Sequence, residues 1–499
     1  MSKIKRINNE IDIAEMWEGL GGDFENIQQI ICEFLDNSVS NLTGKNSEGL
    51  ENHNINVIFK VENDNNIMVR IEDTGTGIVD LDNALKIGNK SVQESPLNEH
   101  GFGLKHALAA ADKTNNSWKI YTKTIDDKKH NEYELIQAPY KTENWTANII
   151  NEIDIPWPGS YTTTGTIIEF VVNKELLSTL TNGIPGANIN TSYERMIDYL
   201  IEDLSFIYSK VLENTSVKMS VKLYKNHIET KNVIITPLQP SWIANSLKAG
   251  EELCDLGNGI VKIEYQFGSI EAGDNMRYYK KNMSSSGVEI RINGRALAYN
   301  LFTDIWHKEK HNCYNHFIGR VNVISEHRES LPETKTAKNA FKTSDKKYEE
   351  LLRWISQKHP NIEEIEESND SFNEVSLFKT LATNMKTYSN PNDTITTEQY
   401  VFKEEMKLRI DLYQCSNNNV TIYEGKKIKT TPKDVYQLRM YWDGLVYEGM
   451  KPNKGILIGS VHPDSVKNMI EYVNKMKDAN GNNYNFETVT WEEKNIPIE

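Results

Sequence analysis

The sequence has few cysteines and no long apolar run. Its 499 residues include four cysteines, which are scattered and form no Cys-x-x-Cys pair. This spacing argues against a disulfide framework or a cysteine-ligated zinc site, and it fits a reducing cytoplasm. No run of about 18 apolar residues occurs, and no apolar segment follows the basic N-terminal residues. We therefore expect a cytoplasmic protein with neither a signal peptide nor a membrane span.

An excess of basic residues is also lacking. The chain has 56 Lys and Arg against 71 Asp and Glu, a formal net charge of −15. This balance excludes a protein that coats nucleic acid by overall charge, but a local basic groove stays compatible with it, because phosphate contacts depend on where charge lies. The hydrophobic content of 38% is ordinary for a folded globular protein. At about 150 residues per domain, the length predicts roughly three domains.

Helical and strand patterns alternate along the chain, which predicts a multidomain α+β protein. Apolar residues at helical spacing indicate helices at 24–42, 104–111, 193–211 and 346–357. Strand-like runs occur at 54–61, 67–72, 118–124, 132–138, 166–172, 216–224, 259–267, 287–293, 317–324, 409–413, 420–426 and 455–459.

An acidic segment separates the last region from the rest. Residues 361–374 contain six acidic residues and no basic one, so self-repulsion should keep the segment extended. We therefore expect a linker at 361–374, flanked by three domains at 1–185, 186–360 and 375–499.

Two polar residues lie one turn apart on the first predicted helix. Glu33 and Asn37 are four residues apart, so their side chains share one face. A carboxylate there is suited to deprotonating a water, and an amide oxygen is a suitable ligand for Mg²⁺. Two solvated polar residues are the alternative reading.

A glycine-containing turn follows the second predicted strand. Asp73 ends that strand, and Gly75 and Gly77 come directly after it. The glycines let the chain turn tightly and let a planar ligand approach, while Asp73 is placed to accept a hydrogen bond from an exocyclic amine. An ordinary glycine-rich turn is the alternative.

A second glycine loop opens the predicted helix at 104–111. Gly101, Gly103 and Lys105 stand in Gly-Phe-Gly-Leu-Lys. Free N–H groups at a helix start, with a nearby positive charge, favour phosphate binding. A flexible loop is the alternative. Further along, Thr166 follows a glycine at the start of a strand.

In this order and spacing, the four segments resemble the GHKL ATPase superfamily, which includes gyrase, heat-shock chaperone ATPases, histidine kinases and MutL proteins. Asp36-Asn37 and Gly-Phe-Gly-Leu-Lys are most similar to the MORC-like branch, and the resemblance covers residues 10–175. It implies a Bergerat-type α/β sandwich. Ser40 departs from it, because several relatives have an acidic residue there.

The resemblance implies a role for each of these residues in binding ATP with Mg²⁺. Glu33 would be the general base for water attack on the γ-phosphate, and Asn37 the Mg²⁺ ligand. Asp73, helped by Thr166, would read the adenine amine. Residues 84–103 would form a lid that closes on the nucleotide. Space for adenine and contacts to the phosphates would come from Gly75, Gly77, Gly101, Gly103 and Lys105.

In this superfamily a lysine of a second domain contacts the γ-phosphate. The strand at 287–295 resembles part of such an S5-type transducer domain. Lys335 and Lys338 are the candidate lysines, and we favour Lys338; a solvated surface lysine is the alternative for either. The resemblance also implies a homodimer that forms on nucleotide binding, with residues 1–25 placed to cross over.

A second set of charged residues lies in the last region, 375–499. The pattern of this region predicts the order helix, strand, strand, helix, strand, helix. Glu424 and Lys426 are two apart in a strand, so they point the same way. A turn at 417–419 lets Asp411, on the preceding strand, face them. Two carboxylates beside a lysine are suited to holding Mg²⁺ and activating water for attack on phosphorus. A solvated hairpin is the alternative.

This order of elements, with Gln437 near the start of the following helix, resembles the PD-(D/E)xK restriction-endonuclease-like superfamily over 398–475. The resemblance implies that Asp411, Glu424 and Lys426 form a nuclease site, assisted by Gln437.

The sequence departs from this second family pattern. Ile410 stands where the family usually has proline. The upstream glutamate that some members use has two candidates, Glu398 and Glu405.

Together the two resemblances predict an ATP-gated, Mg²⁺-dependent nuclease. Its target would be nucleic acid, with DNA preferred to RNA. Its biological role would be prokaryotic anti-phage defence. Any partner protein would be encoded by a neighbouring gene. The alternative is a MORC-like nucleotide-driven clamp or remodelling protein whose nuclease-like domain binds without cutting. A histidine kinase is disfavoured because no dimerising histidine helix precedes the ATP motifs, and a topoisomerase because no cleavage domain of that kind is recognisable.

Overall fold

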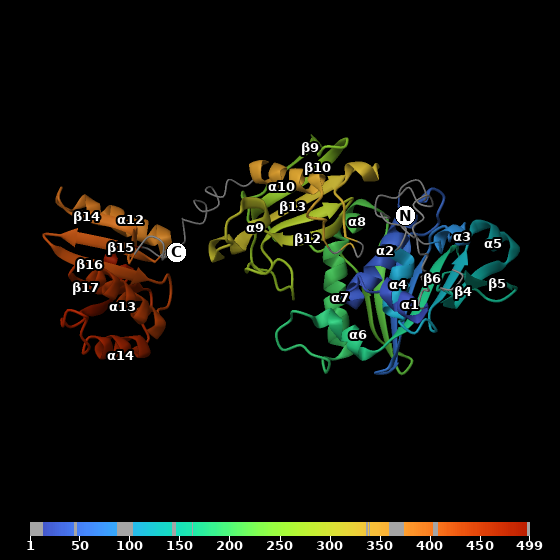
Figure 1. Ribbon diagram of the computed structural model, residues 1–499, viewed down its shortest axis with the longest axis horizontal. Coiled ribbons are helices and arrows are strands. Elements are labelled where there is room, and N and C mark those ends of the chain that lie inside the picture. The colour runs from blue at the N-terminus through green and yellow to red at the C-terminus, as the bar shows by residue number, and fades with distance from the viewer. Residues whose placement is uncertain are drawn as a thin grey trace, which may run out of the picture. The chain divides into compact units, whose positions relative to one another are not determined.

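The chain divides into two compact units, Met1–Pro360 and Asn361–Glu499 (Figure 1). The α+β fold class is confirmed, with three sheets among the described residues. No helix in the described ranges is long and apolar enough to cross a membrane. This computed structural model describes residues 13–43, 47–86, 103–141, 146–161, 163–335, 338, 340–358, 374–402 and 408–496.

The first unit contains an eight-stranded mixed sheet in the order β5-β4-β3-β6-β2-β1-β7-β8. β1 pairs antiparallel with β2 and parallel with β7. Because β7 and β8 lie after residue 185, this sheet draws strands from both sides of that position. The strands are β1 (Asn54–Asn63), β2 (Asn66–Asp73), β3 (Lys119–Lys123), β4 (Glu132–Lys141), β5 (Thr146–Ile153), β6 (Gly165–Val172), β7 (Lys218–Lys225) and β8 (Ile228–Ile234).

Helix α2 (Ile27–Leu42) carries the first predicted site residues. It begins after Asn26, whose side chain accepts a hydrogen bond from the Gln29 N–H. Its apolar stripe is at most 1% exposed and packs into the core with α4 (Gly103–Ala111). The stripe consists of Ile27, Ile30, Ile31, Phe34 and Leu35. Further helical segments are α1 (Ile13–Leu20), α3 (Leu81–Ala84), α5 (Ile125–His130), α6 (Lys174–Ser178) and η2 (Thr179–Thr181).

A second, five-stranded sheet in the same unit has the order β12-β11-β13-β10-β9. β11 and β13 are parallel, and the other neighbours pair antiparallel. The strands are β9 (Lys248–Asp255), β10 (Ile260–Ser269), β11 (Gly287–Ile292), β12 (Arg295–Leu301) and β13 (Phe317–Ile324). The helical segments of this part are α7 (Tyr193–Ile207), α8 (Ser209–Asn214), α9 (Thr303–Trp306), η3 (Asn312–His316), η4 (Arg328–Ser330) and α10 (Lys346–Lys358).

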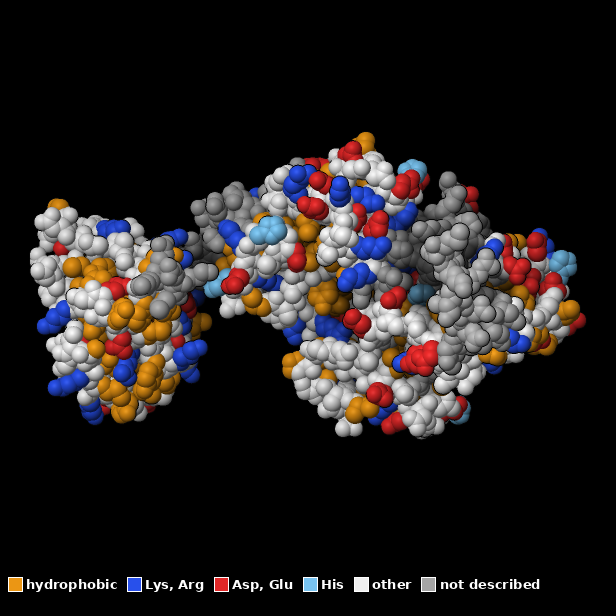
Figure 2. Space-filling view, in the orientation of Figure 1, with side chains coloured by type: hydrophobic (Ala, Val, Ile, Leu, Met, Phe, Trp, Pro, Cys, Tyr) orange, Lys and Arg blue, Asp and Glu red, His pale blue; other side chains and the backbone are white. Residues whose placement is uncertain are grey.

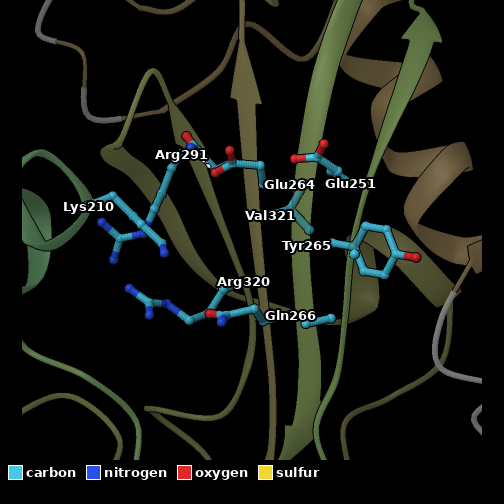
Figure 3. Close-up of a pocket in the computed structure, with 11 residues that line it drawn as sticks. Lys210, Glu251, Glu264, Tyr265, Gln266, Arg291, Arg320 and Val321 are labelled. Carbon is cyan, nitrogen blue, oxygen red and sulfur yellow. Dashed lines mark hydrogen bonds between the residues drawn. The ribbon is translucent and has the colours of Figure 1, made fainter. Parts of the chain in front are cut away.

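A cavity of about 380 Å³ opens on this second sheet. Figure 3 shows the cationic groups of Lys210, Arg291 and Arg320 gathered on one side of it. Arg291 and Arg320 both donate to the buried Glu289 carboxylate, at 2.9 and 2.6 Å. The two arginines of the cavity wall therefore share one buried carboxylate.

The second unit is built on a five-stranded sheet in the order β14-β15-β16-β17-β18. Alternate residues of β16 and β17 face opposite sides: Ile422 and Leu457 pack with α13, whereas Tyr423 and Ile456 pack with α12. The sheet is therefore covered on both faces. The elements are α12 (Glu374–Thr387), β14 (Thr394–Tyr400), β15 (Arg409–Ser416), β16 (Asn419–Gly425), α13 (Pro432–Tyr447), β17 (Pro452–Gly459), α14 (Asp464–Val473), β18 (Phe486–Thr490) and η6 (Glu492–Lys494).

Candidate functional site

Glu33 is buried in the first unit and pairs with a lysine far along the chain. The carboxylate is 3% exposed, and the Lys338 ammonium lies 3.1 Å from its Oε2 and donates to its Oε1 at 3.2 Å. Lys338 is 6% exposed, whereas Lys335 is exposed to solvent. Of the two candidate lysines, the structure therefore brings Lys338 to Glu33.

Gly103 packs directly against this carboxylate. A Cβ added at Gly103 would lie 1.7 Å from Glu33 Oε1. The start of α4 therefore approaches Glu33 as closely as backbone can, which only glycine permits while Glu33 keeps its position. Asn37 lies one turn further along α2 and is half-buried. Gly101 lies outside the described residues.

Asp73 ends β2 as a buried acceptor. Its carboxylate accepts from Ser38 Oγ at 2.8 Å, from the Gly75 N–H at 2.9 Å and from the Thr166 N–H at 3.2 Å. Burial nevertheless raises the pKa of Asp73 to about 6. The Thr166 hydroxyl is buried beside it with no hydrogen-bond partner. Asp73 and Thr166 thus come together as predicted, and an unsatisfied hydroxyl lies next to the carboxylate.

Two glycines around Asp73 are required by the backbone. Gly77 has φ +74°, and a Cβ there would lie 2.6 Å from the Lys123 carbonyl oxygen. Gly165 has φ +152°, and a Cβ there would lie 2.0 Å from the Asp73 carbonyl oxygen. At Gly75 an added Cβ would lie 3.0 Å from the Asp73 side chain. The backbone can therefore pass this closely beside Lys123 and Asp73 only with glycine at positions 77 and 165, whereas at position 75 a small shift of the Asp73 side chain would make room.

Lys105 lies on α4, with its ammonium bonded to main-chain carbonyls. Nζ donates to the oxygens of Ala84 and Lys86 at 3.0 and 2.8 Å. Desolvation lowers the pKa of Lys105 to about 8. The ammonium thus ties α4 to the segment after α3. Most of the lid expected over 84–103 lies outside the described residues.

In the second unit, the hairpin brings the predicted nuclease residues together. Because Leu412 pairs with Tyr423, Asp411 and Glu424 face each other across β15 and β16. Asp411 accepts from the Gly425 N–H at 3.0 Å, and the Lys426 ammonium donates to Glu424 Oε1 at 3.0 Å. The three side chains therefore form one cluster.

Glu424 is fully buried. Desolvation and the nearby negative charge of Asp411 raise the pKa of Glu424, and desolvation raises the pKa of Asp411. Two buried carboxylates facing each other fit a divalent cation, and Mg²⁺ commonly takes only one or two protein carboxylates and fills its other positions with water. In the part of the chain that the structure describes, no group of three or more His, Cys, Asp or Glu is arranged to hold a metal.

Gln437 reaches this cluster through a residue that the sequence motifs did not single out. Its amide donates to Tyr441 Oη at 2.8 Å. Burial and the negative charge of Glu424 raise the pKa of Tyr441 above its usual range, which places the phenol beside Glu424. Tyr441 lies four residues after Gln437, so the two share one helix face. This spacing is the sequence feature from which Tyr441 could have been predicted.

A further glutamate at this cluster comes from α12. Glu374 lies 3.5 Å from the Lys426 ammonium and accepts from the Lys427 N–H at 3.2 Å. Glu398 instead pairs with Arg409 at 3.2 Å, and Glu405 lies outside the described residues. No sequence signal identified Glu374, because the predicted linker at 361–374 ended on it, whereas in the structure it begins α12.

The comparisons with known proteins find likeness only among solved structures. No family model matches the sequence, and no curated protein matches it. The chain is similar to the N-terminal domain of a DNA repair protein, with 13% identity, a TM-score of 0.41, and 69% of this chain and 96% of that chain covered. It is also similar to the B-subunit of the DNA gyrase from Myxococcus xanthus, with 9% identity, a TM-score of 0.35, and 66% and 87% covered.

Proposed function

We propose that the chain is an ATP-gated, Mg²⁺-dependent nuclease, with a GHKL-type ATPase of the MORC-like branch in its first unit and a PD-(D/E)xK-type site in its second. One observation carries the proposal. Lys338 pairs with the buried Glu33 across 305 positions of sequence. The GHKL resemblance implies a lysine from a second domain that reaches the γ-phosphate. The alternative, a surface lysine without such a role, would be solvated, whereas Lys338 is 6% exposed beside the predicted base.

The geometry of the first unit supports distinct roles for its residues. Glu33 deprotonates the attacking water, because it is a buried carboxylate held in place by the Lys338 ammonium, which lies within 3.2 Å of both its oxygens. Asp73 accepts a hydrogen bond from the adenine amine, and Thr166 Oγ1 supplies a further polar contact. Asn37 holds Mg²⁺ bound with ATP. The resemblance assigns the phosphates to Lys105 and the glycine loop, and the Lys105 ammonium would then exchange its bonds to the Ala84 and Lys86 carbonyls for bonds to phosphate.

The geometry of the second unit supports hydrolysis of a phosphodiester. Asp411 and Glu424 would hold Mg²⁺, which polarises the phosphate and lowers the pKa of bound water when present. Lys426 orients the attacking water and stabilises negative charge on the phosphate. Tyr441, held by Gln437, fixes the position of Glu424. Glu374 keeps the Lys426 ammonium at the cluster.

Nucleotide binding gates this nuclease by closing and dimerising the first unit, and the substrate is nucleic acid, DNA in preference to RNA. Figure 2 shows acidic and basic side chains interspersed on the visible face of each unit. Binding therefore rests on local contacts and not on bulk charge. The biological role that fits this architecture is prokaryotic anti-phage defence in the cytoplasm, with any partner protein supplied by a neighbouring gene.

The alternative function is a nucleotide-driven clamp or remodelling protein whose second unit binds nucleic acid without cutting. One observation favours it. Burial and the negative charge of Asp411 raise the pKa of Glu424, which favours its protonated form unless a cation replaces the proton. The nuclease needs that carboxylate ionised, and the clamp does not.

Nucleotide affinity should depend on the ionisation of Asp73. Because burial raises the pKa of this carboxyl to about 6, it accepts a hydrogen bond from adenine above that pH and loses this capacity as the pH falls through about 6. We expect the affinity for a non-hydrolysable ATP analogue with Mg²⁺, measured by calorimetry, to fall between pH 7 and pH 5. Inorganic triphosphate, which lacks adenine, is the control and should bind with a flatter pH profile.

Asp73→Asn should weaken binding of the analogue at every pH and remove the difference between the two profiles. If wild-type protein binds the analogue equally well at pH 5 and pH 7, Asp73 does not read adenine. If the analogue does not bind at all, the proposed ATPase is wrong.

A further inference from the structure

Four charged side chains form a closed cluster behind the candidate ATP site. Asp36 lies three residues after Glu33 on α2 and is 1% exposed. Its carboxylate accepts from Arg295 Nε at 2.7 Å and from the Tyr208 hydroxyl at 2.8 Å. The Lys338 ammonium lies 3.5 Å from its other oxygen, Oδ2. Two carboxylates thus face two cations, and none of the four side chains exceeds 6% exposure.

Arg295 holds both ends of this cluster. While its Nε donates to Asp36, its NH1 donates to the main-chain carbonyl of Lys338 at 3.1 Å. The same guanidinium therefore fixes the residue that carries the ammonium and the carboxylate that competes for it. A planar guanidinium with several donors in fixed directions can do this, whereas a lysine has only one nitrogen.

The backbone turn that precedes Arg295 is itself held in place. It begins β12, directly after the tight turn at Gly294, where φ is +88°. The Gly294 N–H donates to Asn322 Oδ1 at 2.8 Å, and the Gly294 carbonyl accepts from Arg291 at 3.3 Å. The turn between β11 and β12 is therefore anchored to β13, so Arg295 transmits the position of the second sheet to α2.

Competition between the two carboxylates gives Arg295 a function. Glu33 and Asp36 lie one turn apart, and a single ammonium lies between them. With Arg295 satisfying Asp36, Lys338 lies closer to Glu33, at 3.1 Å against 3.5 Å. Without Arg295, Asp36 would be a buried charge with only Lys338 to compensate it, and the ammonium would move toward Asp36.

We propose that Arg295 is a positioning residue that holds Lys338 in the ATP site, so that the second sheet controls hydrolysis through it. This inference rests on the proposed ATPase function. Arg295 would act through Lys338, without touching nucleotide itself. Its effect should therefore appear in kcat and vanish once Lys338 has been removed.

The test combines kinetics with a double-mutant cycle. Arg295→Gln should lower kcat for ATP about 10-fold, within the usual range of coupling between contacting residues, and change KM little. Arg295→Gln with Lys338→Gln should be no slower than Lys338→Gln alone. Arg295→Lys keeps a positive charge beside Asp36 but loses the hydrogen bond to the Lys338 carbonyl. This variant should therefore fold readily and have a kcat between those of Arg295→Gln and the wild type.

Arg277 provides the matched control. It is another partly buried arginine of the first unit, with its guanidinium 2.7 Å from the Asp203 carboxylate. Arg277→Gln should cost comparable thermal stability, and its effect on kcat should multiply with that of Lys338→Gln. A role of Arg295 in stability alone would make the two arginines behave alike.

A second readout needs no nucleotide. Lys338 is 6% exposed, so acetylation of its amine in folded full-length protein should be slow. Arg295→Gln should accelerate acetylation at Lys338, measured by mass spectrometry, and Arg277→Gln should not. Multiplicative kinetics for Arg295→Gln and Lys338→Gln, or unchanged acetylation in both Arg295 variants, would overturn the proposal. Wild-type protein that fails to hydrolyse ATP would refute the ATPase function, and the proposed role of Arg295 with it.

Discussion

Glu33→Ala should bind ATP as the wild type does and hydrolyse it about 10²–10⁴-fold more slowly, the usual loss when a general base is removed. The carboxylate is buried, and the Lys338 ammonium lies within 3.2 Å of both its oxygens. Binding should persist because adenine and phosphates are held by other residues. Phosphate release reports turnover, and calorimetry with a non-hydrolysable analogue reports affinity.

Glu202 offers a matched control for this variant. It is also buried in the first unit, but its carboxylate accepts from the main-chain N–H groups of Met276 and Arg277 and so has a structural role. Glu202→Gln should lower the melting temperature and leave kcat of the folded protein near the wild-type value. Normal turnover in Glu33→Ala would show that another group is the base.

Glu424→Ala and Lys426→Ala should each reduce nucleic-acid cleavage by more than about 10²-fold and leave ATP turnover nearly intact. Glu424 and Asp411 are the facing carboxylates of the second unit, and Lys426 is bonded to Glu424 at 3.0 Å. Loss of one hard oxygen ligand should also shift any residual activity toward higher Mg²⁺ or toward Mn²⁺. Gel assays with and without EDTA measure cleavage.

Lys454→Ala is the control for Lys426→Ala. Its ammonium pairs with Glu487 at 2.7 Å on β17 and β18 of the same sheet, and both side chains are about two-fifths exposed. Such exposed pairs contribute little to stability, so we expect cleavage close to the wild-type level. Cleavage that survives EDTA or Glu424→Ala would rule out the metal mechanism.

Interior strands could be predicted from the sequence, and edge strands could not. Every strand with two neighbours in its sheet corresponds to a predicted run; β13, for example, has its predicted bounds of 317–324. The six strands without a predicted run, β5, β8, β9, β12, β14 and β18, are the two edges of each sheet. Ile149, Ile228 and Leu253 on these edges are exposed. Because an edge strand is paired on one side only, it needs less of the apolar alternation that identifies a strand.

Local spacing predicted the residues that share one element, but not those brought from a distance. Glu424 and Lys426 follow the strand period, and Glu33 and Asn37 the helical one. Asp36, in contrast, is held by Tyr208 and Arg295, 172 and 259 positions away. Nothing in the sequence near either residue marks this contact, because it depends on how the second sheet packs against α2. Ser38, which donates to Asp73, was missed because that contact depends on how α2 packs against the end of β2 in the first sheet.

The most direct test of the proposed function is cleavage of labelled DNA and RNA by full-length wild-type protein in Mg²⁺, with no nucleotide, with ATP and with a non-hydrolysable analogue. Asp73→Asn, assayed at a nucleotide concentration that its weakened affinity leaves largely unbound, and Glu424→Ala, which should not cut, are compared in parallel. The proposal predicts that the wild type cleaves only when nucleotide is present, that DNA is cut in preference to RNA, and that neither variant cleaves. Equal cleavage by the wild type and Asp73→Asn without nucleotide would contradict the gate, and nucleotide binding with no cleavage of either nucleic acid would favour the clamp.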